Sequence, residues 1–231
     1  MNKINLTEFE EKIKYSFNNK DTLLLAFTHS SYANEHNLGK FDYNERLEFL
    51  GDAALDLVIS KFIYMKFPEM PEGELTKLRA GVVCEGSLAK KAREIGLGKF
   101  LQLGKGEEIT GGRDRESVLA DAFEAVIGAI CIDGGMPDVE KYVLSLMTNV
   151  VEELKSSFRN IDYKTRLQEL IQKTSRMPVS YAVIGERGPD HGKEFIVEVY
   201  HNGNTLGMGV GKSKKEAEQS AAGNAIKHMN S

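Results

Sequence analysis

The sequence predicts an all-α domain followed by a small α+β domain with the element order α-β-β-β-α. Apolar residues recur at helical spacing through residues 1–155, where the alternation typical of strands is nearly absent. Such alternation, together with an Asn-Gly hairpin signal, begins only after residue 176. A polar stretch at 156–161 separates the two patterns. We therefore expect domains at 1–155 and 162–231, joined by a linker.

Helices account for almost all of the first predicted domain. Polar, Gly-rich and Pro-containing segments interrupt the apolar pattern and mark the helix ends. The predicted helices span residues 6–17, 20–36, 44–67, 74–96, 117–133 and 136–157. A Gly-rich loop is expected at 103–116, and Gly134 and Gly135 close the fifth helix.

The second predicted domain begins and ends with a helix. Between the helices, two segments alternate in the manner of strands, and a third strand follows the turn at Asn202-Gly203. The predicted helices span 163–175 and 213–229, and the predicted strands span 177–188, 193–201 and 204–211.

Composition narrows the class of protein. Its 231 residues fit one or two domains, and 41% hydrophobic residues suffice for buried cores. No apolar run approaches the ~20 residues that a membrane-spanning helix needs, and no signal-peptide pattern occurs, so we expect a cytoplasmic protein without membrane contact. Two cysteines, Cys84 and Cys131, are too few for a disulfide framework or a zinc cluster. Their apolar neighbours predict buried, reduced thiols.

Charge differs between the two parts of the chain. The net charge is −4, which argues weakly against a nucleic-acid partner. Residues 1–159 carry 20 − 26 = −6, whereas residues 160–231 carry 10 − 8 = +2. An acidic body with a mildly basic appendage is compatible with a metal site in the first part and an anion-binding surface in the second.

The segment "NERLEFLGDAALD" gathers carboxylates on one side of a predicted helix. At 100° per residue, four acids share an arc of about 80°. They are Glu45, Glu48, Asp52 and Asp56. A solvated helix face has the same pattern. Like charges one turn apart nevertheless repel by a few tenths of a kcal/mol, and the only basic neighbour is Arg46. This segment alone leaves both interpretations open.

A second pair of acids lies in a far more apolar helix. Asp121 and Glu124 are the only charges between Ser117 and Ile132, and their i,i+3 spacing places them on the same side. A helix that is apolar all round is buried, and a buried carboxylate requires a partner, a proton or a metal. Buried salt bridges to Arg79 or Arg113 are the alternative explanation.

Taken together, the two helices offer carboxylates without matching histidines or cysteines. Oxygen-only ligands favour Mg²⁺, with Mn²⁺ as a substitute, over zinc. A site of this kind suits phosphodiester hydrolysis. Glycosidases also use paired carboxylates, but that chemistry does not explain the second domain.

Three motifs resemble the ribonuclease III family, the endonucleases that cut double-stranded RNA. They are "NERLEFLGD" (44–52), "PEGELTKLRAGVV" (71–83) and "LADAFEAVIGAI" (119–130). The part after residue 162 resembles a double-stranded-RNA-binding domain. The resemblance covers nearly the whole chain, in the order of the bacterial enzyme.

The resemblance implies roles for individual acids. The metal-site acids of the family fall on Glu48, Asp52, Asp121 and Glu124. Asp52 and Glu124 would be catalytic, with Glu124 the most direct ligand of the metal. Glu45 and Glu72 would be accessory acids, and Asp56 matches no family site residue.

The implied activity is Mg²⁺-dependent hydrolysis of double-stranded RNA by a homodimer, with Phe49 at the dimer contact. The products would carry 5′-phosphates, 3′-hydroxyls and a short 3′ overhang, and the substrates would be ribosomal RNA precursors and structured transcripts. The alternative is a double-stranded-RNA-binding protein without catalysis. A small-molecule phosphohydrolase that uses the same acids is a weaker possibility.

Residues expected to contact RNA lie in three segments of the second domain. A binding domain of this type recognises the minor groove of A-form RNA by its shape, and a helix N-terminus attracts phosphate. The expected contacts are Gln168, Glu169, Gln172, His191, Lys212, Lys214 and Lys215. A solvated helix start would equally explain the lysines. Arg113 and Arg115 either reach phosphate or lie in water.

Overall fold

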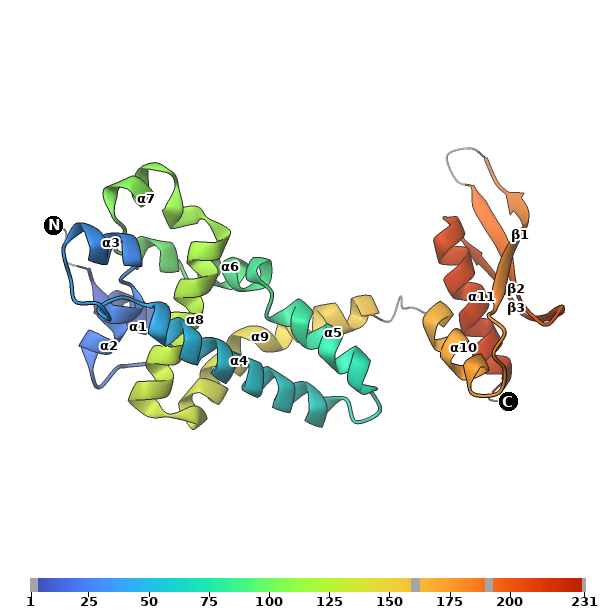
Figure 1. The fold of residues 1–231 in the computed structure, drawn as a ribbon, viewed down its shortest axis with the longest axis horizontal. Helices are drawn as coiled ribbons and strands as arrows, with labels where there is room; N and C mark the ends of the chain where they lie inside the picture. Colours follow the sequence, from blue (N-terminus) through green and yellow to red (C-terminus); the bar gives the residue numbers. More distant parts are fainter. Residues whose placement is uncertain (1–3, 159–162, 190–192, 230–231) are drawn as a thin grey trace. The chain divides into compact units, whose positions relative to one another are not determined.

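The computed structural model describes residues 4–158, 163–189 and 193–229. The chain divides into two compact units, Met1–Ser156 and Ser157–Ser231. The described parts of the first unit are helical, and those of the second unit combine helices with a three-stranded sheet (Figure 1). This confirms the predicted fold class.

The first unit is built around two long helices, α4 (Glu45–Lys66) and α8 (Glu116–Gly134), which cross at its centre (Figure 1). Its other helices are α1 (Leu6–Ile13), α2 (Lys20–Ala26), α3 (Ser30–Glu35), α5 (Glu72–Val82), α6 (Glu85–Glu94), α7 (Lys105–Ile109) and α9 (Met136–Phe158), with short 3₁₀ turns η1 (Leu97–Phe100) and η2 (Gly112–Asp114). Most of α8 is buried, as its apolar composition predicts. The acids on α8 therefore enter the unit's interior with the helix.

Local signals explain where several helices begin and end. The side chain of Asn5 caps α1 by accepting from the backbone N–H of Glu8, and Asn19 caps α2 in the same way. α4 ends before Pro68, which cannot continue a helix. Gly135 follows α8 with a φ of 78°, a conformation that glycine adopts without strain.

Two predicted helices are interrupted in the structure. The segment 20–36 forms α2 and α3, because Thr28 leaves the helix and makes a parallel bridge with Gln102. The segment 74–96 forms α5 and α6, separated at Cys84. The predicted loop at 103–116 contains α7 and η2. Cys84 is exposed rather than buried, because it lies at this break between helices.

The second unit packs two helices on one face of an antiparallel sheet. Its helices are α10 (Tyr163–Gln172) and α11 (Lys214–Met229), and its strands are β1 (Ser180–Arg187), β2 (Glu194–His201) and β3 (Asn204–Gly211), in the order β1-β2-β3. The turn between β2 and β3 places Asn202 and Gly203 at φ values of 49° and 78°, as an Asn-Gly hairpin requires. A Cβ on Gly209 would lie 2.1 Å from the backbone nitrogen of Ala221, so α11 rests directly on β3.

Among the described residues, no helix combines the length and the apolar character needed to cross a bilayer.

Candidate active site

The two central helices approach so closely that only glycine fits where they cross. A Cβ on Gly51 of α4 would lie 1.8 Å from the carbonyl oxygen of Glu124 on α8. A Cβ on Gly128 of α8 would lie 2.0 Å from the carbonyl oxygen of Leu47. Because backbone meets backbone, side chains one turn away on either helix converge beside the crossing.

Three carboxylates meet at this point. Glu48 of α4 and Asp121 and Glu124 of α8 each offer one oxygen within 4.8 Å of the others. All three side chains are half-buried. These three residues are called the acid cluster below. Sequence spacing predicted the pair on α8, and the glycine crossing adds the acid from α4.

The acid cluster holds concentrated negative charge. Burial, followed by the charges of Asp52, Glu48 and Asp121, raises the pKa of Glu124 to about 8. Burial also raises the pKa of Glu48, with Asp121 the largest charge contribution. Burial likewise raises the pKa of Asp121, with Glu85 the largest charge contribution. In all three acids burial and neighbouring negative charge outweigh the opposing effects, and a divalent cation would offset them.

The alternative explanation by buried salt bridges is wrong for the described residues. Arg79 lies 3.9 Å from Asp56 and donates to Ser60. Arg113 pairs with Glu108 and donates to backbone carbonyls. Within the described ranges, no lysine or arginine lies within 4.0 Å of a carboxylate oxygen of the acid cluster.

The other predicted acids occupy different positions. Asp52, one turn after Glu48, lies outside the group of three, although its charge raises the pKa of both Glu48 and Glu124. The negative charge of Glu45 also raises the pKa of Glu48. Glu72 is exposed at the start of α5 and accepts from Thr76.

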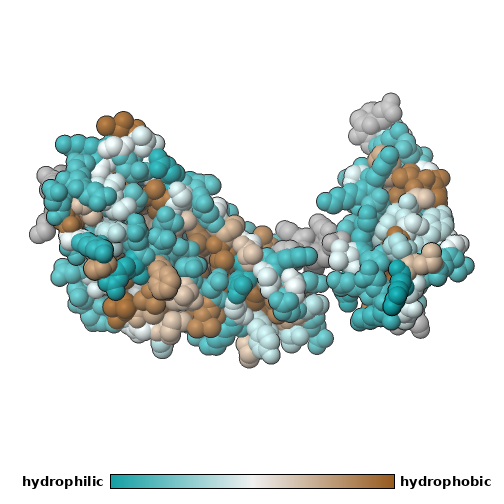
Figure 2. All heavy atoms as spheres, viewed as in Figure 1, coloured by the Kyte–Doolittle hydropathy of each residue, from teal (hydrophilic) through white to brown (hydrophobic). Residues whose placement is uncertain are grey.

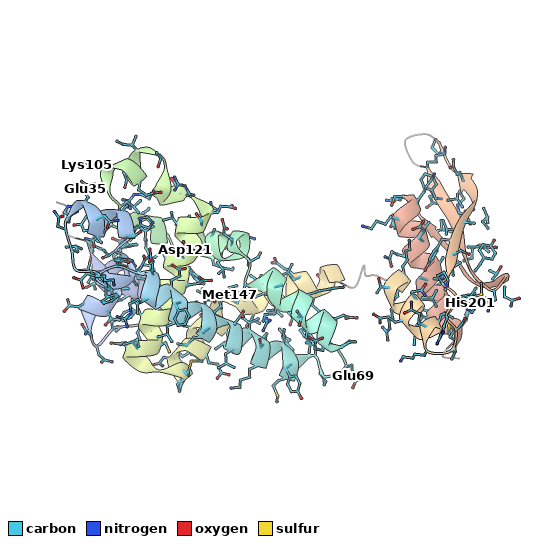
Figure 3. All side chains as sticks on the ribbon, in the orientation of Figure 1. Glu35, Glu69, Lys105, Asp121, Met147 and His201 are labelled. Atoms are coloured by element: carbon cyan, nitrogen blue, oxygen red, sulfur yellow. The ribbon has the colours of Figure 1, made fainter. Side chains whose placement is uncertain are left out.

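The structure does not bring Glu72 to the acid cluster within one chain. In Figure 3, Asp121 lies on α8, near the N-terminal half of α4. Glu69, three residues before Glu72, lies just beyond the C-terminal end of α4. Glu72 is also absent from the charges that raise the pKa of the three clustered acids.

Two residues near the acid cluster escaped the sequence analysis. Glu85, the first residue of α6, raises the pKa of Asp121, and His29 lowers it when positively charged. The Nδ1 atom of His29 accepts from the backbone N–H of Ser31 and thereby caps α3. Both residues come from other elements, so no spacing within one helix could have indicated them.

Arg113 and Arg115 are held within the first unit. The Arg113 guanidinium donates to Glu108 and to the carbonyl oxygen of Leu101 at 3.0 Å. Arg115 pairs with Glu107 at 2.5 Å. These contacts favour a structural role over a phosphate contact.

In the second unit, the predicted RNA contacts differ in accessibility. Glu169 and Gln172 of α10 are exposed, and so are Lys212, just before α11, and Lys214 and Lys215 in its first turn. Gln168 instead accepts from the backbone N–H of Val179 at 3.0 Å, and its amide nitrogen is buried. His191 lies outside the described residues.

Comparison with known proteins matches both units. The family described as Ribonuclease-III-like matches residues 19–150, and the double-stranded RNA binding motif matches residues 163–229. Ribonuclease 3 of Geobacillus kaustophilus is 49% identical over 223 residues, which cover 96% of this chain and 90% of the relative. Ribonuclease 3 of Caldanaerobacter subterraneus is 49% identical over 224 residues, covering 97% and 98%.

A solved structure agrees with the sequence relatives. The nuclease domain of ribonuclease III from Campylobacter jejuni is 41% identical, with a TM-score of 0.59, and covers 63% of this chain and 97% of that one. Matches of this extent, over both units, confirm the family predicted from the acidic motifs. The chain belongs to the ribonuclease III family of endoribonucleases.

Proposed function

We propose that this protein hydrolyses double-stranded RNA in a reaction that depends on Mg²⁺, with Mn²⁺ as a substitute. The observation that carries the proposal is the acid cluster, in which three carboxylates from two helices lie within 4.8 Å of one another. An oxygen-only set of this kind fits a hard divalent cation. The raised pKa values fit the same conclusion, because burial and mutual repulsion raise them and a bound cation would offset both.

Glu48, Asp121 and Glu124 would hold the cation, and Asp52 would be the fourth acid of the site. When bound, the cation supplies positive charge at the phosphodiester and acidifies water. Because burial and the neighbouring acids raise its pKa to about 8, Glu124 would have to lose a proton to serve as a ligand. Asp52 and Glu124 orient the attacking water.

Water then attacks phosphorus and the bond to the 3′ oxygen breaks. The departing oxygen takes up a proton, which leaves a 3′-hydroxyl and a 5′-phosphate. Glu45 lies close enough to act on Glu48 and would be an accessory acid. Glu72 could serve as an accessory acid only from another chain or after movement, given its place at the start of α5.

A homodimer would provide two such sites. Phe49 of α4 is 79% exposed, and Leu57 and Tyr64 follow on the same helix with 59% and 67% exposure. Figure 2 shows hydrophobic residues along α4 on the visible face. An apolar groove of about 330 Å³ lies between α4 and α5. The Campylobacter jejuni structure concerns flexibility in a region involved in dimer formation.

Two subunits cutting one strand each would leave a short 3′ overhang. The second unit would bind the duplex through Glu169, Gln172 and the lysines Lys212, Lys214 and Lys215, with His191 entering the minor groove. Gln168 would join them only if it released Val179. In this proposal residues 1–155 form the nuclease domain, 156–161 the linker and 162–231 the RNA-binding domain.

We further propose that the substrates are ribosomal RNA precursors and structured transcripts in the cytoplasm. A non-catalytic RNA-binding protein is the competing function, and the intact acid cluster disfavours it.

Cleavage of a labelled RNA duplex tests the proposal. Wild-type protein should cut with Mg²⁺ and not with chelator, and Glu124→Gln should be at least about 100-fold slower. Glu116→Gln, which changes an exposed acid on the same helix, is the matched control and should cut normally. If Glu124→Gln cuts at the wild-type rate, the site is misassigned; if no protein cuts but all bind the duplex, the non-catalytic alternative holds.

A further inference from the structure

His29 lies between α2 and α3 and acts on the acid cluster from a third part of the chain. Burial and the charge of Glu85 raise the pKa of Asp121, whereas His29, when protonated, lowers it. The charges that act on Glu48 and Glu124 come from acids. We propose that the Nε2–H group of His29 donates a hydrogen bond to a non-bridging oxygen of the scissile phosphate, an inference that rests on the proposed function.

Backbone contacts hold His29 near the two central helices. α2 packs against α8, the helix that carries Asp121. Directly after α2, the Thr28 carbonyl accepts from the N–H of Asn44 at 2.9 Å. Asn44 is buried and immediately precedes α4. The N–H of His29 in turn donates to the Gln102 carbonyl at 3.1 Å. The position of the histidine is therefore set by bonds to two other segments.

The electrostatic effects on Asp121 agree with this placement. Glu45 follows Asn44, and its charge also acts on Asp121. His29 and Glu45 thus reach the same carboxylate from the two segments that the Thr28–Asn44 bond joins. Within the described ranges, His29 makes no hydrogen bond to Asp121. Its outer ring nitrogen therefore stays free for a ligand at the edge of the acid cluster.

The hydrogen bonds of His29 assign a proton to Nε2. Its Nδ1 atom accepts from the backbone N–H of Ser31 at 3.2 Å and lies 2.8 Å from the Ser31 Oγ. That hydroxyl is held in place because it accepts from the N–H of Gly104 at 2.9 Å. Since Nδ1 accepts, the neutral ring carries its proton on Nε2, and a protonated ring carries one there as well. The half-buried ring leaves Nε2 accessible to solvent.

A free N–H donor beside acids fits a phosphate oxygen. Water bound to a cation directs its hydrogens outward and so requires acceptors, which carboxylates such as Glu45 supply. A phosphate oxygen requires donors, which ionised acids lack. A donor that is already oriented also stabilises the negative charge that develops on the phosphoryl oxygens as water attacks, and it keeps its own proton throughout.

The substitution His29→Asn separates this role from the capping of α3. His29 is the N-cap residue of α3, and asparagine is among the best N-cap residues, so it can still accept from the N–H of Ser31. The shorter side chain places no donor where Nε2 lies. Asn19→Ala is the matched control for a weakened cap, because it removes the equivalent bond from the N–H of Asp21 at the start of α2.

Single-turnover cleavage of a labelled RNA duplex, with Mg²⁺ and excess full-length protein, measures the effect. His29→Asn should cut at least about tenfold more slowly than wild type, as expected for the loss of a hydrogen bond to a charged group. Asn19→Ala should cut at close to the wild-type rate.

A phosphorothioate at the mapped cleavage position locates the contact. The two stereoisomers are tested separately, and sulfur accepts hydrogen bonds weakly. For one isomer, the slowing relative to the all-oxygen duplex should be smaller in His29→Asn than in wild type. Affinity for Mn²⁺ without RNA, measured by electron paramagnetic resonance, should be unchanged in His29→Asn, because the histidine contacts RNA rather than the cation.

Three results would overturn the inference. They are a wild-type cleavage rate in His29→Asn, equal sulfur effects in both proteins for both isomers, and loss of Mn²⁺ affinity in the variant. The second would make the role of His29 structural, and the third would place it on the cation. Failure of the proposed function is distinguishable, because wild-type protein with Mg²⁺ would then leave the all-oxygen duplex uncut.

Discussion

Replacing Gly128 by alanine should force apart the helices that form the acid cluster. The added Cβ would lie 2.0 Å from the Leu47 carbonyl oxygen, whereas ordinary contact begins at 3.4 Å, so the helices must separate by about 3.4 − 2.0 = 1.4 Å. Both sides of this contact are backbone, and no side-chain rotation can relieve it. Overpacking of a core costs about 1–3 kcal/mol, and we expect a loss at the top of that range or above it.

The same displacement should damage activity more than stability. Glu48 and Glu124 lie on different helices, and a shift of about 1 Å at reacting groups can cost roughly 100-fold in rate. Urea unfolding gives the stability change, and initial rates on duplex RNA give the activity change. Gly106→Ala in α7 is the control, because a Cβ there meets nothing within 4 Å. Wild-type stability and rate in Gly128→Ala would refute the reasoning.

Three further predictions address other parts of the molecule. Without metal, wild-type stability should fall as pH rises from about 4.5 through the Glu124 pKa of about 8, because the folded state binds that proton more tightly than the unfolded chain. At about pH 9, the free energy of unfolding of Glu124→Gln should therefore exceed that of wild type by about 1–2 kcal/mol, a figure reduced to allow for partial exposure. At about pH 4 the two should differ little. Urea unfolding with chelator present measures both values, and a variant less stable than wild type at about pH 9 would contradict the prediction. Gly209→Ala should unfold the second unit, seen as lost duplex binding with metal binding retained, because its Cβ would lie 2.1 Å from the Ala221 nitrogen; normal duplex affinity would rule this out. Arg113→Lys should cost about 1–3 kcal/mol and leave the salt dependence of RNA binding unchanged, because it disrupts the bonds to Glu108 and the Leu101 carbonyl; a flatter salt slope would instead assign Arg113 to phosphate.

Much of the fold could be predicted because helices and hairpins depend on local patterns. Apolar spacing located α4 and α8, and the Asn202-Gly203 turn located the β2–β3 hairpin. The break at Thr28 could not be predicted, because it depends on a bridge to Gln102, far along the chain. Local periodicity carries no information on such distant pairing.

The candidate site likewise combines features that local sequence spacing predicts with features that depend on contacts between distant segments. The i,i+3 spacing of Asp121 and Glu124 predicted a shared side, and the structure places Glu48 with them. What the pattern could not reveal is the close crossing that Gly51 and Gly128 permit, since that depends on two helices meeting. The same limit applies to Glu85, whose charge reaches Asp121 from α6.

Anomalous diffraction from crystals soaked in Mn²⁺ would test the central claim most directly. We expect one strong anomalous peak that marks a manganese ion among Glu48, Asp121 and Glu124, with carboxylate oxygens about 2.1–2.2 Å from the ion. No peak among these three side chains, or an arginine or lysine neutralising them instead, would contradict the assignment of the acid cluster as the metal site of a nuclease.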